Sequence, residues 1–304
     1  MAASTNESKR TAFVEFAAER LIKASGVVAI VFVILIFAFL LREGVPAFAE
    51  VPIGNLFSSR WYPIENYFGI LPLILGSLVV TIGAAIIAMP IGLLTAIFIA
   101  EIAPRWLREI LKPMIEIVAG IPSVVLGFFG VVVLSSVVRQ WLNLPTGLTA
   151  FTGSLILAYM ALPTIVSVAE DALDAVPRSY RDAALALGAT KWQTIWMVTV
   201  KAARSGILTA MMLGIGRAIG ETMAVMMVTG NAARMPLTLD SFFLPVRTMT
   251  ATIAAEMGEV AQGSTHFHVL FAIGIVLFVI TFMVNLVASF AIFRQTRRSA
   301  RLLS

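Results

Sequence analysis

The sequence predicts an all-α integral membrane protein with six transmembrane helices and with both termini in the cytosol. Hydrophobic residues make up 59% of its 304 residues, and several apolar runs are long enough to cross the roughly 30 Å of hydrocarbon in a bilayer. No long polar region could form a separate soluble domain. Residues 1–66 hold a cytosolic N-terminus, the first span and an outer loop, and residues 67–304 hold a five-helix core.

The six spans are expected at residues 24–41, 68–100, 113–138, 150–170, 205–230 and 266–293. The second is longer than the bilayer and carries Pro72 and Pro90, so we expect it to kink or to continue into the cytosol. Pro122 in the third span and Pro163 in the fourth remove helix hydrogen bonds. The carbonyls that they free can serve either a kink or a water-filled path.

The distribution of Lys and Arg sets the orientation of the spans, because short cytosolic loops collect positive charge. With the N-terminus inside, the cytosolic segments hold most of the 22 Lys and Arg residues, and the outer loops hold only Arg42, Arg60, Arg139, Arg234 and Arg247. This asymmetry predicts N-in, C-in topology. The net charge of +5 then reflects topology and contact with anionic membrane lipid, and it requires no nucleic acid partner.

Several kinds of chemistry are excluded by the motifs that the sequence lacks. It has no Gly-Lys-Ser/Thr phosphate loop, and the glycines of residues 214–220 lack the spacing of a dinucleotide fingerprint. Any ATP and Mg²⁺ that drive this protein must therefore bind another subunit. The absence of cysteine excludes disulfides and thiolate metal sites. The spans hold no Ser or Asp constellation with a plausible base, which argues against an intramembrane hydrolase.

Two glycines in the fifth expected span predict close helix packing. Gly216 and Gly220 form a small-xxx-small face, which lets a neighbouring helix approach. Packing is the favoured interpretation of this glycine-rich segment.

Arg217 and Glu221 are the residues of this span that packing cannot explain. A charged side chain at the bilayer centre costs on the order of 2.5–3.5 kcal/mol, so both should face the bundle interior. Their four-residue spacing places them on one helix face, where they can pair. One interpretation is a buried ion pair that fixes helix register. In the other, Arg217 meets an anion that crosses the membrane, since a guanidinium stays charged and offers two parallel donors to an oxyanion.

Three further residues are candidates for the same path. Glu116 opens the third expected span, and a carboxylate at that depth needs a partner or water unless it lies at the cytosolic interface. Ser123 follows Pro122, and Thr222 follows Glu221. We therefore group Glu116, Ser123 and Thr222 with Arg217 and Glu221 as the candidate translocation site.

Near the last span, His266 and His268 resemble a metal pair, but two-residue spacing puts them on different faces of a helix. We expect them to mark a span that starts at the outer interface, without a metal. Glu256 and Glu259 in the preceding outer loop are either solvated or docking charges for an extracellular partner.

A polar hairpin at residues 177–200 lies between long apolar segments and indicates a cytosolic partner. Ser179 and Asp182 have the spacing of a capping box, Gly188 can close a short helix in a left-handed conformation, and Thr190 with Gln193 repeats the box. The first helix carries little bulk, so another protein could approach it closely. The alternative is an amphipathic hairpin on the membrane surface.

The hairpin is similar to the EAA motif of ABC importer permeases. Asp182, Ala183, Ala184 and Gly188 fall on the Glu-Ala-Ala and Gly positions in register, and with Lys191 they are the residues expected to couple to the ATPase. Asp182 replaces the usual Glu. Lys201 stands where the motif ends in Pro, so we expect the exit from the hairpin to be a more continuous helix than usual.

Over nearly its whole length the chain resembles the phosphate-specific ABC importer permeases of the PstC type. The matching stretches are residues 67–72, 100–104, 115–123 and, most specifically, 213–225. The resemblance implies a type I importer permease (MetI-like) core with one extra N-terminal span, in a bacterial or archaeal cytoplasmic membrane. Arg217 and Glu221 match charged positions that the family places in the translocation path.

The resemblance also implies partners. These are a second, related permease (PstA type), two copies of a cytosolic ATPase (PstB type) that bind ATP and Mg²⁺, and an extracytoplasmic phosphate-binding protein (PstS type). The resemblance is also compatible with a cytosolic phosphate-signalling regulator as a further partner.

The expected function is that of a permease subunit of an ATP-driven importer of inorganic phosphate, with no covalent chemistry in this chain. A permease for another oxyanion, such as phosphonate, molybdate or sulfate, is an alternative. A secondary transporter that uses Glu116, Glu221 or Arg217 in a proton relay is another. It would show an inverted repeat, and no convincing repeat is found.

Overall fold

The computed structural model describes the backbone of residues 2–301 and the side chains of residues 15–290 except 17, 239 and 288. Apart from a two-residue antiparallel ribbon in which Trp61 lies opposite Phe68, the described chain is built from helices. The outer N-terminal segment holds α1 (Ala2–Gly44), α2 (Pro46–Glu50), α3 (Ile53–Leu56), β1 (Trp61–Tyr62), η1 (Pro63–Glu65) and β2 (Tyr67–Phe68).

The core follows in chain order, and several of its helices are interrupted. Its first part holds α4 (Leu71–Ile97), η2 (Phe98–Ile102), α5 (Arg105–Ala119), α6 (Ser123–Phe129), η3 (Gly130–Leu134), α7 (Ser135–Trp141) and α8 (Ala150–Asp174). The second part holds α9 (Arg178–Ala186), α10 (Lys191–Gln193), η4 (Thr194–Thr199), α11 (Val200–Ala202), α12 (Arg204–Gly220), α13 (Met223–Val228), η5 (Leu239–Phe243), α14 (Met249–Glu256) and α15 (Thr265–Arg301).

The long apolar helices account for the predicted spans. Five segments within the described residues are long and apolar enough to cross a membrane: Ala18–Glu50, Leu71–Ile102, Ser123–Trp141, Ala150–Asp174 and Thr265–Val287. A sixth is formed if Lys191–Ala202 and Arg204–Gly220, which meet at 71°, make one bent span. The prediction of six spans is confirmed in this form.

Two of the expected spans are broken where the sequence had suggested continuous helices. The span expected at 113–138 starts at Ser123, because α5 ends at Ala119 and Pro122 directs the chain into an extended conformation. The span expected at 205–230 is divided, since α12 ends at Gly220 and Glu221 is extended, with φ −70° and ψ 130°.

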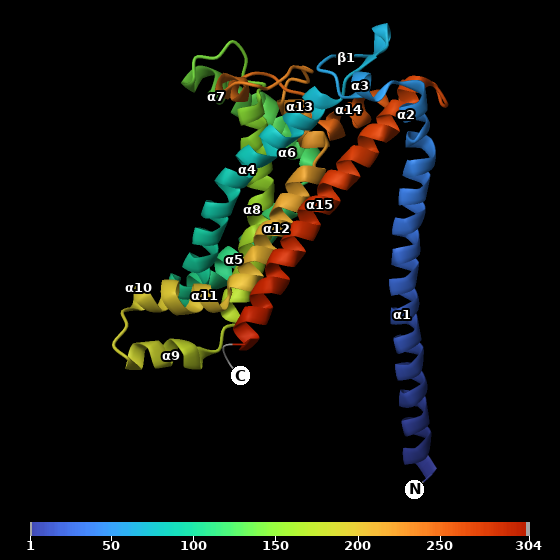
Figure 1. The fold of residues 1–304 in the computed structure, drawn as a ribbon. Coiled ribbons are helices and arrows are strands. Elements are labelled where there is room, and N and C mark those ends of the chain that lie inside the picture. The colour runs from blue at the N-terminus through green and yellow to red at the C-terminus, as the bar shows by residue number, and fades with distance from the viewer. Residues whose placement is uncertain (1, 302–304) are drawn as a thin grey trace.

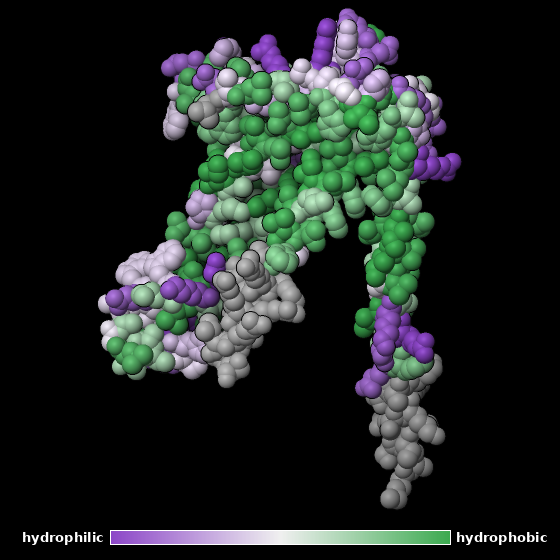
Figure 2. Space-filling model, in the orientation of Figure 1, coloured by the Kyte–Doolittle hydropathy of each residue, from purple (hydrophilic) through white to green (hydrophobic). Residues whose placement is uncertain are grey.

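The arrangement of the helices agrees with the predicted topology. Figure 1 shows the N-terminus, the C-terminal end of α15 and the α9–α10 hairpin at one end of the molecule, and β1, α3 and α14 at the other. In Figure 2, hydrophobic residues cover the middle of the visible face, and hydrophilic residues gather at its two ends. The hairpin and both described ends of the chain therefore lie on the same side of the apolar belt.

The core sits where α4 and α12 pack against α8, and it depends on small residues. Gly92 of α4 and Gly214 of α12 both contact Ile165 of α8 so closely that a side chain at either glycine would collide with it. No described part of the chain packs on Gly216 or Gly220, because the space beside both is open, so their role in helix packing stays a prediction. Within the chain, the glycines of α12 that pack closely on α8 are Gly206, against Ala172, and Gly214.

The first helix stands apart from this core over much of its length. In Figure 1, α1 diverges from the other helices toward its N-terminus. Near its other end it packs on α15 through Phe37 and Phe278, whose ring centroids are 4.6 Å apart, and through Phe39 and Phe271 at 5.6 Å. The extra N-terminal helix is thus attached to the core through the outer half of α15.

Candidate functional site

Arg217 lies in the last turn of α12 on an exposed face of the chain. Its guanidinium donates hydrogen bonds to the hydroxyl of Thr164 in α8, at 3.2 Å, and to the carbonyl of Ala119, the last residue of α5, at 3.4 Å. The open space beside Gly216 and Gly220 lies on the same helix. Arg217 therefore joins three helices on a face that this chain leaves uncovered.

Glu221 does not pair with Arg217, so that part of the prediction is wrong. Within the described residues, no ion pair joins the two side chains. The Glu221 carboxylate accepts a hydrogen bond of 3.3 Å from the backbone of Ala224, and its main-chain carbonyl accepts one of 3.0 Å from the Thr250 hydroxyl. The physical reason is that α12 ends between the two residues, so they no longer share a helix face.

The two helix breaks lie close together. Gly127 of α6 touches Met227 and Ala224 of α13, and Ala119, just before the first break, contacts Arg217, just before the second. Thr222 donates to the carbonyl of Gly220 at 3.3 Å within the second break. The structure thus brings the ends of α5 and α12 together and packs α6 on α13.

Glu116 and Ser123 lie on either side of the first break. Ser123 is the first residue of α6 and is half-buried, and Glu116 is exposed one turn before the end of α5. Among the described residues, neither side chain forms a polar contact with Arg217. Their membership of the translocation site stays a prediction.

The hairpin has the predicted turn but begins differently. Gly188 adopts φ +84°, and Thr190 and Gln193 form both halves of a capping box. The predicted Ser179–Asp182 box is wrong, because α9 starts at Arg178 after Pro177 and no side chain caps it.

The residues of the hairpin that were expected to couple to the ATPase are uncovered apart from one. Asp182, Ala183, Gly188 and Lys191 are exposed, whereas Ala184 is buried. Leu187, at the tip, is 89% exposed. Leu185 and Trp192 of the hairpin are exposed as well, so the hairpin presents several uncovered apolar side chains.

The exit from the hairpin is bent, contrary to the expectation that Lys201 would make it more continuous. The helix formed by α10, η4 and α11 meets α12 at 71°, with the break at Ala203. Lys201 lies in α11, two residues before this break. The bend therefore does not require a proline.

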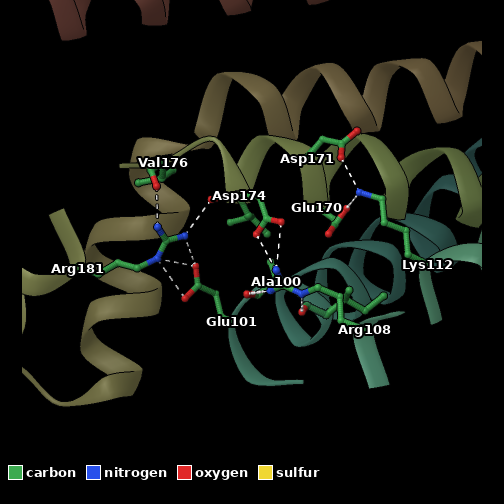
Figure 3. A network of polar contacts seen from close by, with 11 residues as sticks. Ala100, Glu101, Arg108, Lys112, Glu170, Asp171, Asp174, Val176 and Arg181 are labelled. Atoms are coloured by element: carbon green, nitrogen blue, oxygen red, sulfur yellow. Dashed lines mark hydrogen bonds and ion pairs between the residues drawn. The ribbon is translucent and has the colours of Figure 1, made fainter. Parts of the chain in front are cut away.

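A polar network that sequence reasoning missed connects the hairpin to the core (Figure 3). Arg181 of α9 binds Glu101 of η2, with Nη2 and Oε1 2.6 Å apart, and donates to the carbonyls of Leu173 and Val176. Arg108 of α5 pairs with Asp174 at 3.2 Å and donates to the carbonyls of Ile99 and Ala100. Each arginine thus donates hydrogen bonds to carbonyls at the end of one helix and forms an ion pair with a carboxylate of another helix.

Lys112 of α5 completes the network. It contacts Glu170 at 2.8 Å and Asp171 at 2.9 Å, and these hydrogen bonds, Glu170 first, raise the pKa of Lys112 above its ordinary value. One feature of the sequence could have predicted this network. Three acidic residues, Glu170, Asp171 and Asp174, end α8, where the helix dipole disfavours negative charge, so they require cations nearby.

A cavity of about 630 Å³ lies between the hairpin and this network. Charged side chains of both signs line it: Glu101, Arg108, Asp174, Arg178, Arg181, Asp182 and Lys191. The first helix of the hairpin, α9, is therefore joined to the core by polar contacts around a hollow, whereas Ile195 in the second half of the hairpin packs into the apolar core.

At the opposite end, Glu256 is enclosed rather than solvated. Its carboxylate binds Arg247 at 2.7 Å, His266 at 2.8 Å and the indole of Trp61 at 3.2 Å. Burial raises the pKa of Glu256, but the His266 hydrogen bond, the Arg247 charge and the Trp61 hydrogen bond together hold it below its ordinary value.

His268 contacts Glu50 at 2.9 Å, away from the partner of His266. The two histidines therefore lie on different faces of α15, as predicted. Glu259 remains exposed.

Comparison with solved structures identifies the fold. The alginate ABC transporter bound to its alginate-loaded periplasmic protein matches with a TM-score of 0.62 at 15% identity, covering 88% of this chain and 92% of that one. The MetNI methionine ABC transporter matches with a TM-score of 0.60 at 16% identity, covering 78% and 99%. The predicted type I importer permease fold is confirmed.

Curated relatives cover most of the chain. A probable ABC transporter permease, YqgH of Bacillus subtilis, is 44% identical over 76% of this chain and 75% of its own length. Phosphate transport system permease proteins PstC are 36% identical in Xylella fastidiosa (81% and 80% covered) and 33% in Pasteurella multocida (88% and 90%).

A family model describing the inner membrane component of binding-protein-dependent transport systems matches residues 88–299. This range includes the hairpin, both helix breaks and Arg217. The chain is a multi-pass transport subunit of the inner membrane and not an enzyme. It belongs to the family of binding-protein-dependent transport system inner membrane components.

Proposed function

We propose that this chain is the permease subunit of an ATP-driven importer of inorganic phosphate. The observation that carries the proposal is the position of Arg217, which lies beside two helix breaks on a face that the chain leaves uncovered. Relatives named as phosphate transport permeases support the choice of cargo. Since membership of the family implies an ATPase and a binding protein as partners, the chain works within a larger assembly.

The anion would bind the guanidinium of Arg217, which has N–H groups that form no hydrogen bond within the described chain. Arg217 uses two described hydrogen bonds, to Thr164 and Ala119, whereas a guanidinium has five N–H groups. The remaining donors can form parallel hydrogen bonds to phosphate. Glu221, Thr222, Glu116 and Ser123 complete the site that we assign to translocation, and a related permease (PstA type) would cover it from the other side.

The hairpin would transmit the work of ATP hydrolysis. Of the two copies of a cytosolic ATPase (PstB type), which bind ATP and Mg²⁺, one would dock on the exposed residues Asp182, Ala183, Gly188, Lys191 and Leu187 of this chain. A phosphate-binding protein (PstS type) would deliver the cargo at the outer end, where β1, α3 and α14 lie.

The test is to copurify the assembly, place it in liposomes and measure ATP hydrolysis and uptake with phosphate, phosphonate, molybdate and sulfate in turn. Phosphate should stimulate both activities most. Stimulation by another oxyanion alone would reassign the cargo. Phosphate accumulation driven by a proton gradient without ATPase would instead identify a secondary transporter.

A further inference from the structure

The helix α5 contacts the core differently at its two ends. Arg108 near its start and Lys112 at its middle bind the acidic end of α8, and at its last residue the carbonyl of Ala119 accepts a hydrogen bond from Arg217. A 15-residue helix is about 22 Å long at 1.5 Å per residue. One helix therefore reaches from the cytosolic network to the arginine assigned to the anion.

The hairpin enters the same network through a mostly enclosed ion pair. The side chains of Arg181 in α9 and Glu101 in η2 are 19% and 10% exposed, so solvent screens their attraction only in part. Glu101 adjoins Ala100, whose carbonyl Arg108 binds. A displacement of α9 therefore acts on η2, and through Arg108 on the start of α5 (Figure 3).

Apolar packing holds α5 only weakly. No residue of α5 is fully buried, whereas α8 has many buried residues. An apolar groove of about 270 Å³ separates parts of α5 from α4 and α8, with Leu111, Val118, Tyr159 and Pro163 among its lining residues. Elements with few buried contacts move at low cost. The position of α5 therefore depends on its polar contacts as well as on the partly buried Leu111 and Ile115, which pack on the core.

We propose that α5 is a transmission helix: the Glu101–Arg181 and Lys112–Glu170 ion pairs set its position, and movement of the hairpin shifts Ala119 relative to Arg217. Glu101, Arg181 and Lys112 are thus positioning residues. The proposal rests on the function proposed above. The second half of the hairpin leads through the 71° bend into α12, which carries Arg217, so the hairpin acts on both sides of the Arg217–Ala119 contact.

The first test measures coupling in liposomes that contain the whole assembly. Glu101→Gln and Lys112→Gln should lower the phosphate transported per ATP hydrolysed, roughly two- to thirty-fold, while ATP hydrolysis continues. The matched control is Arg105→Gln, which breaks an exposed ion pair with Glu109 on the same helix and should leave the ratio unchanged. A normal ratio in both network variants would overturn the proposal.

The second test reports movement directly and does not depend on cargo. The natural chain has no cysteine, so Ala119→Cys and Leu213→Cys can report the distance between the end of α5 and the exposed face of α12. Their cross-linking rate should change when a non-hydrolysable ATP analogue binds, and adding Glu101→Gln should abolish the change. A change that persists with Glu101→Gln would exclude transmission through this pair.

The two tests separate the two proposals. If the wild-type assembly transports another oxyanion but the ATP-dependent cross-linking change still requires Glu101, the proposed cargo is wrong and the transmission role of α5 stands. If phosphate transport is normal and cross-linking does not respond to ATP, the proposed cargo stands and the transmission role of α5 is wrong.

Discussion

Arg217 of α12 and Thr164 of α8 are joined by a hydrogen bond of 3.2 Å between guanidinium and hydroxyl. Thr164 follows Pro163, the proline inside α8. The bond holds the guanidinium at one edge and leaves other N–H groups free for a ligand. The arginine is thus oriented by neighbours that are uncharged, so its positive charge is not neutralised within the chain by Glu221.

We expect Arg217→Gln to abolish or strongly reduce phosphate uptake while the assembly still copurifies. Hydrogen bonds from a charged group to an anion contribute about 1.5–3 kcal/mol, so the loss should be roughly ten- to a hundred-fold. Uptake into liposomes measures it. Arg234→Gln, at an exposed outer position, is the control. Normal uptake by the Arg217 variant would remove this residue from the mechanism.

Thr164→Val should weaken phosphate uptake by a smaller factor, roughly five-fold or about 1 kcal/mol, because it removes a hydrogen bond that only orients the Arg217 guanidinium and leaves the side-chain volume nearly unchanged. The change should appear as a higher phosphate concentration at half-maximal uptake. Thr95→Val is the matched control, since the Thr95 hydroxyl bonds only to its own helix at Ile91. Equal effects of the two substitutions would show that Thr164 does not orient Arg217.

Gly188→Val should detach or uncouple the ATPase. Gly188 has φ +84° and open space around it, so the cost is conformational, about 1–2 kcal/mol for a left-handed L-residue. Gly188→Asn should be milder, since Asn tolerates this conformation. Gly258→Val, at a position with equally open space but no positive φ, is a further control. Copurification of the ATPase is the readout, and full recovery with Gly188→Val would contradict the docking role.

Lys201→Pro should be tolerated, because the helix already bends by 71° two residues later and a proline placed near a kink disturbs little regular structure. Ala210→Pro, at a buried position inside α12, should prevent assembly. Yield and ATP-dependent uptake distinguish the two. Misfolding of the Lys201 variant would show that α11 must remain regular up to the bend.

Glu256→Gln should destabilise the outer end of the protein by about 1–3 kcal/mol, because Arg247 and His266 would lose a charged partner. The folded-state pKa of Glu256 is lowered, so its contribution is present above the unfolded value near 4.5 and is lost as pH falls through the folded value. Melting temperatures in detergent should therefore differ between wild type and variant at pH 7, and the difference should shrink as the pH falls below 4.5 and vanish below the folded-state pKa. The exposed Glu259→Gln should match wild type throughout.

The sequence predicted the features that depend on local chemistry. The length of the apolar runs predicted the spans, and the distribution of Lys and Arg predicted the topology. Gly188 and the Thr190–Gln193 capping box predicted the turn of the hairpin. What it missed depends on residues far apart in the chain. Arg181 and Glu101 are 80 positions apart, and no local pattern pairs them. Arg217 and Glu221 were expected to pair because a continuous helix was assumed, and a glycine and an extended residue broke it.

The contact of Ile165 with Gly92 and Gly214 has a mechanical consequence. The Ile165 side chain prevents α4, α8 and α12 from sliding past one another, so these three helices should move together as one rigid body. Alternation between the two sides of the membrane must then be concentrated at the joints around residues 120–122, 203 and 221–222. Hydrogen exchange that differs between nucleotide states should appear at these joints and be absent from the segment around Ile165.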